Sequence, residues 1–147
     1  MSDKHSIRIR QIEAYAFRID FGESFVPLLT DEPEPIGGGT GPSPEQVLIA
    51  AVSNCLCASL AFALGKYRQE GGGVSAEAIG RVARNAEGRL RLVGIEVDIA
   101  LGAPAESMDR LDRVLAQFEQ FCTVSESVKA GVPVAVAVRD GQGNRLK

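Results

Sequence analysis

The sequence is poor in the side chains from which most metal sites and nucleophile–base pairs are built. Its 147 residues contain one histidine, His5, and no C-x-x-C pair. A four-ligand zinc site needs more cysteine and histidine than this chain supplies. A Ser–His or Cys–His pair would have only His5, close to the N-terminus, as its base. We therefore expect no metal ion and no cofactor.

The chain also lacks a basic cluster. It has 16 Lys and Arg against 19 Asp and Glu, which gives a net charge of −3. Nucleic acid is bound through concentrated positive charge, so we expect no nucleic-acid partner. Residues 1–6 contain no apolar run of the kind that opens a secretory signal, and we therefore expect a cytoplasmic protein.

Cysteine is present in a small, odd number. Cys55, Cys57 and Cys122 cannot all pair within one chain, and in a reducing compartment they are expected to be thiols. Hydrophobic residues make up 45% of the chain and charged residues 24%, which is typical of a globular protein with a core. We expect a single domain over residues 1–147.

Residues 42–70 predict a long central helix. No charged residue occurs between Glu45 and Lys66, so the helix is apolar on nearly every side and must be surrounded. A membrane span is the rival interpretation, because about 20 uncharged residues reach the threshold length. Polar and small residues dilute the run, and the rest of the chain alternates like a soluble protein. We expect a buried helix and no membrane partner.

The two ends of this helix carry recognisable signals. Ser43 and Gln46 have the spacing of a capping box, and Pro44 stands at the first helical position, where a missing N–H costs nothing. Three consecutive glycines at 71–73 are expected to end the helix.

Alternating polarity predicts strands before the helix. We expect one long strand over residues 7–21, bulged or broken near Gln11, and a second strand over 25–30 that forms a hairpin with it. Pro27 favours an edge position for the second strand. A stiff loop rich in proline and glycine, at 31–42, then leads into the helix.

Strands and helices alternate after the central helix as well. The short helix that we expect near the C-terminus has Thr123 as its cap and Glu126 as the capping-box partner. We place two strands at 74–84 and 89–101, two helices at 104–121 and 123–130, and a closing strand at 133–138.

The three cysteines occupy different settings. Cys55 shares a helical stripe with Val52 and Ser59, whereas Cys57 points about 200° away around the helix axis. Cys122 precedes the start of a helix, where backbone N–H groups and the helix dipole favour a thiolate. These patterns leave two interpretations open, because free cysteines are either reactive thiols or small buried hydrophobic residues.

Three motifs together carry a family resemblance. They are G-G-G-x-G-x-S-P-E-x-x-L at 37–48, A-A-V-S-N-C ending at Cys55, and C-x-V-S-x-S-V at 122–128 followed by V-P-V. In this order they resemble the OsmC/Ohr family of thiol-dependent peroxidases. The resemblance implies an α+β fold in which antiparallel sheets wrap around long central helices in an intertwined homodimer.

The resemblance also implies a function and a set of site residues. It implies reduction of organic hydroperoxides, with Cys55 as the peroxidatic thiol, Cys122 as the resolving thiol, and Arg18 and Glu45 assisting. An external dithiol, such as that of a lipoylated protein, would be the reductant. Glu45 lies ten residues before Cys55, roughly 15 Å along a straight helix, so we expect it to act from the partner chain. The alternative is an OsmC-like binding or structural stress protein whose thiols are core residues.

Overall fold

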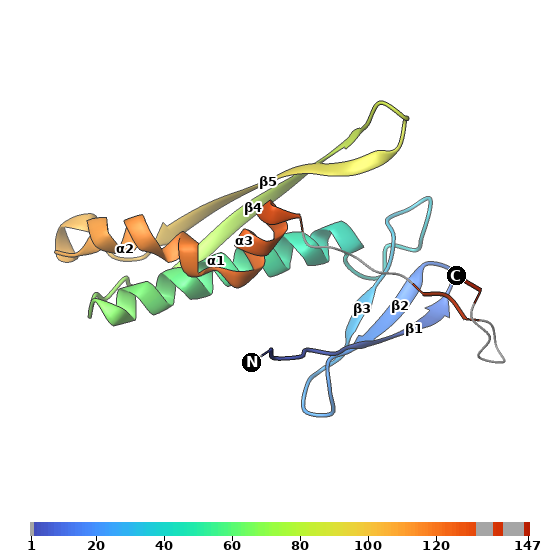
Figure 1. Cartoon of the computed structure of the whole chain (residues 1–147), viewed down its shortest axis with the longest axis horizontal. Helices are drawn as coiled ribbons and strands as arrows, with labels where there is room; N and C mark the ends of the chain where they lie inside the picture. Colours follow the sequence, from blue (N-terminus) through green and yellow to red (C-terminus); the bar gives the residue numbers. More distant parts are fainter. Residues whose placement is uncertain (1, 132–136, 140–145) are drawn as a thin grey trace.

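The computed structural model describes residues 2–131, 137–139 and 146–147. It has mixed helices and antiparallel strands, as predicted (Figure 1). The described elements are β1 (Arg8–Glu13), β2 (Ala16–Asp20), β3 (Leu28–Thr30), α1 (Pro44–Lys66), β4 (Val74–Arg84), β5 (Leu90–Leu101), the 3-10 turn η1 (Ala105–Ser107), α2 (Leu111–Gln117), the 3-10 turn η2 (Phe118–Phe121) and α3 (Thr123–Ala130).

The N-terminal strands form a small antiparallel sheet of order β1-β2-β3. The prediction of one long strand over 7–21 is wrong, because the chain reverses at Ala14, whose φ of 46° lies in the left-handed region. The predicted irregularity near Gln11 is confirmed, since the register shifts between Gln11 and Glu13, whereas the hairpin just after it was not predicted. The next strand is also shorter than predicted, since β3 is confined to three residues after Pro27. In the described sheet β3 lies at an edge, as Pro27 indicated.

The loop between β3 and α1 is organised by Asp31, which is 3% exposed. Its carboxylate accepts the N–H groups of Glu32 at 2.8 Å, Gly38 at 3.1 Å and Thr40 at 3.2 Å, and the Thr40 hydroxyl at 2.8 Å. The Asp31 N–H in turn donates to the Pro42 carbonyl at 3.2 Å. One buried carboxylate thus fixes the path of the chain into α1.

The capping box that starts α1 is confirmed. The Gln46 N–H donates to the Ser43 hydroxyl at 3.3 Å, and the Ser43 N–H donates to the Gln46 side chain at 2.9 Å. The predicted end is wrong: the helix stops at Lys66, several residues before the glycines. Arg68 adopts a left-handed φ of 54°, and the Gln69 N–H returns to the Leu64 carbonyl at 2.8 Å. A non-glycine residue therefore provides the left-handed turn that closes this helix.

The ribbon β4–β5 lies along α1 (Figure 1). The strands predicted at 74–84 and 89–101 are both confirmed, and the turn between them is closed by the Asn85 side chain, which accepts two backbone N–H groups at 3.0 Å. The face of β5 that packs on the helices is half-buried and consists of Ile95, Val97, Ile99 and Leu101. Alternation along β5 therefore predicted the buried face correctly.

The helix predicted over 104–121 is broken into η1, α2 and η2. Met108 is extended, with φ −125° and ψ 91°, and its side chain is buried in the core. Met108 and Val114 are six residues apart, about 240° around a continuous helix, yet both belong to the same buried cluster. The last 3-10 turn ends at Cys122, which is again extended. The strand predicted at 133–138 falls mainly on residues outside the described part of the chain.

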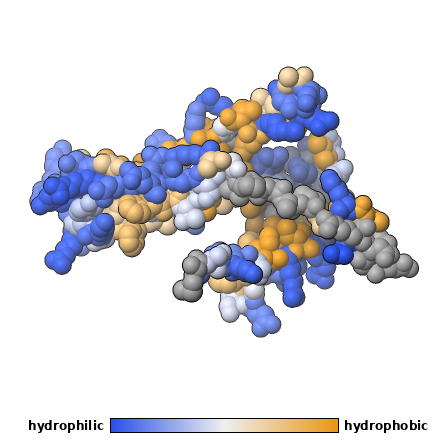
Figure 2. Space-filling view, in the orientation of Figure 1, coloured by the Kyte–Doolittle hydropathy of each residue, from blue (hydrophilic) through white to orange (hydrophobic). Residues whose placement is uncertain are grey.

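Hydrophobic residues are only partly covered within one chain. Two buried clusters lie along α1, one around Leu60 and Val114 and one formed by Val52, Leu56 and Cys122. By length and composition α1 is the one described helix that could cross a membrane, a property that core helices of soluble proteins share, and 33% of its apolar window is buried. Figure 2 shows hydrophobic surface exposed near the middle of the view.

Candidate active site

The structure brings Cys55 and Cys122 together although they are 67 residues apart in the sequence. Cys55 projects from the middle of α1, and Cys122 stands immediately before α3, which packs on α1. Cys55 is half-buried and packs against the cluster that contains Cys122, whose side chain is 0% exposed. Both sulfurs are free thiols in this structure. One half-buried and one enclosed cysteine therefore pack against each other between two helices.

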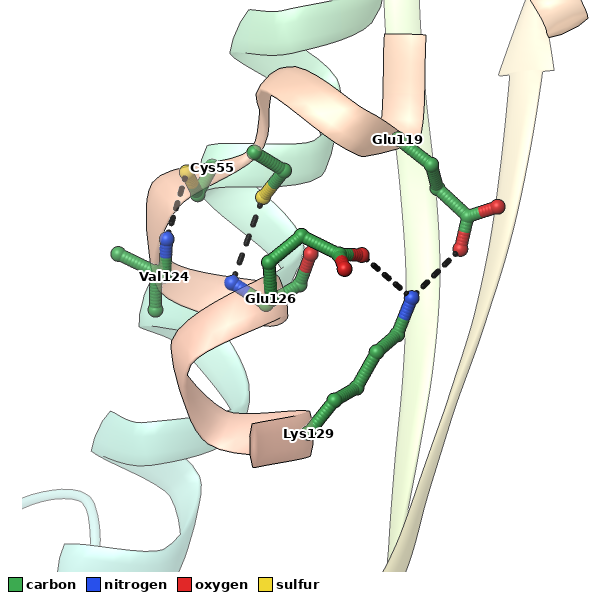
Figure 3. A network of polar contacts seen from close by, with 7 residues as sticks. Cys55, Glu119, Val124, Glu126 and Lys129 are labelled. Carbon is green, nitrogen blue, oxygen red and sulfur yellow. Dashed lines mark hydrogen bonds and ion pairs between the residues drawn. The ribbon is translucent and has the colours of Figure 1, made fainter. Parts of the chain in front are cut away.

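The first turn of α3 contacts both sulfurs (Figure 3). The Val124 N–H donates to the sulfur of Cys55 at 3.5 Å, and the Ser125 N–H donates to the sulfur of Cys122, also at 3.5 Å. Cys122 is the N-cap residue of this helix, so the prediction that Thr123 caps it is wrong. The unpaired N–H groups of a helix start favour negative charge, which is the charge of a thiolate.

The surroundings of the two thiols shift their pKa values in opposite directions. Burial raises the pKa of Cys55 above its ordinary value, and the neighbouring Cys122 raises it further, against a smaller opposing effect of the Val124 N–H. Burial also acts to raise the pKa of Cys122, but the neighbouring Cys55 thiol, the Ser125 N–H and the nearby Ser59 side chain outweigh it, and its pKa lies below the ordinary value.

Two serines complete the surroundings of Cys122. Ser59 and Ser125 are 9% and 3% exposed, and the Ser125 hydroxyl has no hydrogen-bond partner within the described residues. The sequence placed Ser59 on the Cys55 stripe but gave it no role, and it gave none to Ser125. Both lie one helical turn from a cysteine, Ser59 after Cys55 and Ser125 after Cys122, and this spacing is the signal that could have identified them.

Within one chain, Arg18 and Glu45 lie apart from Cys55 and Cys122. Arg18 lies in β2 and its side chain bonds Asp20 at 3.0 Å. Glu45 is exposed in the first turn of α1, with no described bond to Arg18 or to Cys55. The N-terminal sheet that carries Arg18 lies beyond the start of α1, away from α3 (Figure 1). The two thiols and these two residues therefore form separate sets in a single chain.

Cys57 faces a different environment. It lines a shallow groove with Asn54, Ala58 and Ala61 and belongs to neither of the buried clusters. This agrees with the predicted opposite direction of Cys55 and Cys57 around the helix. In the described part of the chain, the His, Cys, Asp and Glu side chains form no group of three that could hold a metal ion.

An apolar groove of about 450 Å³ lies between α1, β5 and α3. Val52 and Leu56, which pack against Cys122, form part of its wall, together with Val97 and Ser125. Its charged lining residues, Glu119 and Lys129, are ion-paired at 3.1 Å on the exposed side (Figure 3). The groove could accept an apolar group next to the residues that enclose Cys122.

Comparison with known proteins identifies the class to which this fold and these thiols belong. A model of the family described as OsmC-like protein matches residues 37–137, and the chain belongs to this family. That range includes both Cys55 and Cys122. No curated protein matches the sequence.

Solved structures share the fold at low sequence identity. An OsmC-like protein of unknown function from Vibrio cholerae is 16% identical, with a TM-score of 0.72, over 87% of this chain and 95% of that one. An organic hydroperoxide resistance protein OsmC from Legionella pneumophila is 14% identical, with a TM-score of 0.67, over 86% and 90%. The organic hydroperoxide resistance protein OhrB of Bacillus subtilis is 16% identical, with a TM-score of 0.64, over 88% and 93%.

Proposed function

We propose that this protein is a thiol-dependent peroxidase that reduces organic hydroperoxides in the cytoplasm. The observation that carries the proposal is the contact between Cys55 and Cys122, two free thiols held by the first turn of one helix. Membership of the OsmC-like family and structural similarity to organic hydroperoxide resistance proteins support it. A half-buried thiol beside an enclosed one suits attack by the first and resolution by the second.

The reaction needs two thiols and one peroxide. The Cys55 thiolate attacks one peroxide oxygen, the O–O bond breaks, and the other oxygen leaves as an alkoxide that takes up a proton to become the alcohol. Cys55 is then a sulfenic acid. The Cys122 thiolate displaces its hydroxide, which forms a disulfide and, with a proton, water. An external dithiol, such as that of a lipoylated protein, restores both thiols by exchange.

The substrate class follows from the apolar groove. Its wall is mainly aliphatic and includes Val52 and Leu56, which pack against Cys122. An alkyl or acyl chain removed from water there gains about 25 cal/mol for each Å² of apolar surface buried. Hydrogen peroxide has no such group to place, so we propose that the enzyme prefers organic hydroperoxides.

The complete site is proposed to need a homodimer. The accessible surface of the single chain is 11482 Å², whereas a compact monomer of 15.6 kDa exposes about 7,300 Å². The excess is several times the roughly 800 Å² that each partner buries in a standard interface. A second subunit can cover this surface and bring its own Arg18 and Glu45 to Cys55, where the guanidinium stabilises the thiolate.

Thiol counting tests the function directly. One equivalent of an organic hydroperoxide should remove two thiols per chain from the parent protein and none from the Cys55→Ser variant. Cys57→Ser is the matched control, because it removes a cysteine of the same helix that faces elsewhere, and it should still lose two thiols. A parent protein that loses no thiol would instead support an OsmC-like binding or structural role.

A further inference from the structure

The turn between β4 and β5 gathers positive charge on an acidic chain. Residues 81–91, R-V-A-R-N-A-E-G-R-L-R, contain four arginines and one glutamate, which gives this segment a net charge of +3. The whole chain carries −3, so the remaining residues together carry −6. Antiparallel pairing brings the arginines on either side of the turn close together along the ribbon. The composition of the whole chain shows no basic excess, but the fold concentrates these side chains in one segment, here called the arginine tip.

The arginine tip is open to solvent and largely without carboxylate partners. All residues from 81 to 91 are exposed, and Figure 1 shows the turn extending away from the helices. Of the four arginines, Arg81 alone has a carboxylate partner in the described chain, at 2.7 Å. Arg84 and Arg91 donate to backbone carbonyls of the tip at 2.6 and 2.7 Å, and Arg89 has no described side-chain bond. A guanidinium has five N–H donors, so these three groups retain donors for acceptors on another molecule.

The arginine tip is continuous with the apolar groove between α1, β5 and α3. One wall of the groove is formed by the four residues that directly follow the tip along β5, Leu92, Val93, Gly94 and Ile95. Val52 and Leu56 of α1 line the same groove and pack against Cys122. A protein bound at the tip would therefore lie beside a groove whose wall includes residues that enclose one of the two proposed redox thiols.

We propose that the arginine tip binds the protein that supplies the reducing dithiol, and that this protein presents an acidic surface. The inference rests on the proposed peroxidase function and adds the place where the reductant binds. Carboxylates on the partner pair with the three arginines that have no carboxylate partner in the described chain, which steers and orients the encounter. The dithiol is carried on an aliphatic arm that enters the groove after the product alcohol has left, so the substrate and the reductant use the groove in turn.

Charge around the groove favours a compact acidic protein over an extended polyanion. On the α3 side of the groove, Lys129 is already bonded to Glu119 at 3.1 Å and to Glu126 at 2.8 Å (Figure 3), so the unpaired positive charge lies on the side of the tip. A nucleic acid or an anionic membrane would extend past the tip and meet the net negative charge of the remaining residues. Three guanidinium groups would also neutralise few phosphates.

The exchange at the thiols balances. One thiolate of the external dithiol attacks the Cys55 sulfur of the Cys55–Cys122 disulfide, the S–S bond breaks, and Cys122 leaves and takes up a proton. Cys55 is the sulfur attacked because it is half-buried, whereas Cys122 is 0% exposed. The second external thiol then attacks the external sulfur of the mixed disulfide, and Cys55 leaves as a thiol. Two protein thiols and one external disulfide are formed, and the two protons come from the dithiol.

The rate of disulfide reduction tests the binding site. The disulfide is formed with diamide, so the measurement does not depend on peroxide reduction. It is then reduced either by an acidic lipoyl domain that carries a dihydrolipoyl group or by free dihydrolipoamide, which is the same dithiol without the protein. Arg89→Glu combined with Arg91→Glu should lower the second-order rate constant for the lipoyl domain by about tenfold or more at low salt and leave that for dihydrolipoamide unchanged. Equal effects on both reductants, or none on either, would overturn the inference.

The matched control is Arg110→Glu combined with Arg113→Glu. It makes the same change in net charge at two exposed arginines near the start of α2, far from the tip (Figure 1), and it should leave both rate constants unchanged. Arg89→Lys with Arg91→Lys keeps the charge and should retain most of the rate. Added salt should slow the reaction of the parent with the lipoyl domain and have little effect on the Glu variant of the tip. Equal loss of rate in the control would show an effect of net charge alone and would refute a specific site.

Binding measured without chemistry separates this inference from the proposed function. An NMR titration of the isotope-labelled protein with the lipoyl domain should shift backbone amide signals of residues 84–91. Shifts at the tip in a protein that reduces no hydroperoxide would refute the proposed function and leave the binding site intact. Shifts confined to other residues, or equal shifts with duplex DNA or phosphatidylglycerol vesicles, would overturn the inference. A change of sedimentation in the Arg89→Glu and Arg91→Glu variant would instead assign the tip to contact with a second copy of the chain and would also overturn it.

Discussion

Cys122 is both the cap of α3 and the neighbour of Cys55, so its sulfur faces two sets of donors. We predict that mild oxidation joins Cys55 to Cys122 in a reversible disulfide and leaves Cys57 as a thiol, because of the three cysteines only the first two pack in one cluster. Peptide mapping before and after reduction checks this. A Cys57 disulfide as the main product would contradict the arrangement of the three side chains.

The identity of this cap could not have been read from the residues alone. Helix caps are usually Ser, Thr, Asp or Asn, and Thr123 satisfied that rule. The structure uses the preceding sulfur because Cys122 is extended and directs its side chain back over the first turn. Local sequence patterns also cannot predict the contact between Cys55 and Cys122, because it depends on how α3 packs on α1. Family resemblance alone paired them.

At the scale of elements, the loop into α1 depends on the charge of Asp31. Its pKa is below the ordinary value of 3.8, first because of the Thr40 hydroxyl and then the backbone N–H groups. A carboxylate whose pKa is lowered by folding stabilises the folded state above its unfolded pKa and loses that effect as pH falls through the folded pKa. We predict that Asp31→Asn lowers Tm at neutral pH.

The same variant should also lose part of the acid dependence of Tm below pH 3.8. Thermal unfolding over a pH series measures both effects. Glu34→Gln is the matched control, because it removes an exposed carboxylate from the same loop. Equal curves for Asp31→Asn and Glu34→Gln would show that the buried carboxylate does not organise the loop.

Close packing at the end of this loop gives another prediction. A Cβ at Gly41 would overlap the backbone carbonyl of Leu29, whereas a Cβ at Gly65 of α1 meets nothing within 4 Å. We expect Gly41→Ala to lower the free energy of unfolding by about 1–3 kcal/mol, and Gly65→Ala to change it little or to raise it by up to about 1 kcal/mol. Denaturant unfolding distinguishes them, and equal effects would refute the close approach.

Elements were predictable where one pattern dominated. β4 and β5 followed from alternation and from the turn beginning at Asn85, and the start of α1 followed from its capping box. The reversal at Ala14 was missed because a change of phase looks the same for a bulge and for a tight hairpin. The break at Met108 was missed because helical periodicity continues across it.

At the scale of the whole molecule, the site is proposed to combine two chains. We predict that inactive Glu45→Ala and Cys55→Ser subunits regain peroxidase activity when mixed, at sites with an intact Glu45 from one chain and an intact Cys55 from the other. Heterodimers are verified with two affinity tags, and each variant alone is the control. Verified heterodimers without activity would place Glu45 outside the site, and a monomer in sedimentation would exclude sharing altogether.

The uncovered apolar surface of α1 leads us to predict that folding and the proposed dimerisation are coupled. Phe62 is 69% exposed and Leu48 40% exposed in the single chain. Apolar side chains that stay in contact with water contribute little hydrophobic stabilisation to the folded state. In the homodimer that we propose, separation of the two subunits would return that surface to water, and we predict that the folded monomer has little stability of its own. The midpoint of thermal unfolding should therefore rise with protein concentration, and dilution alone should favour unfolding.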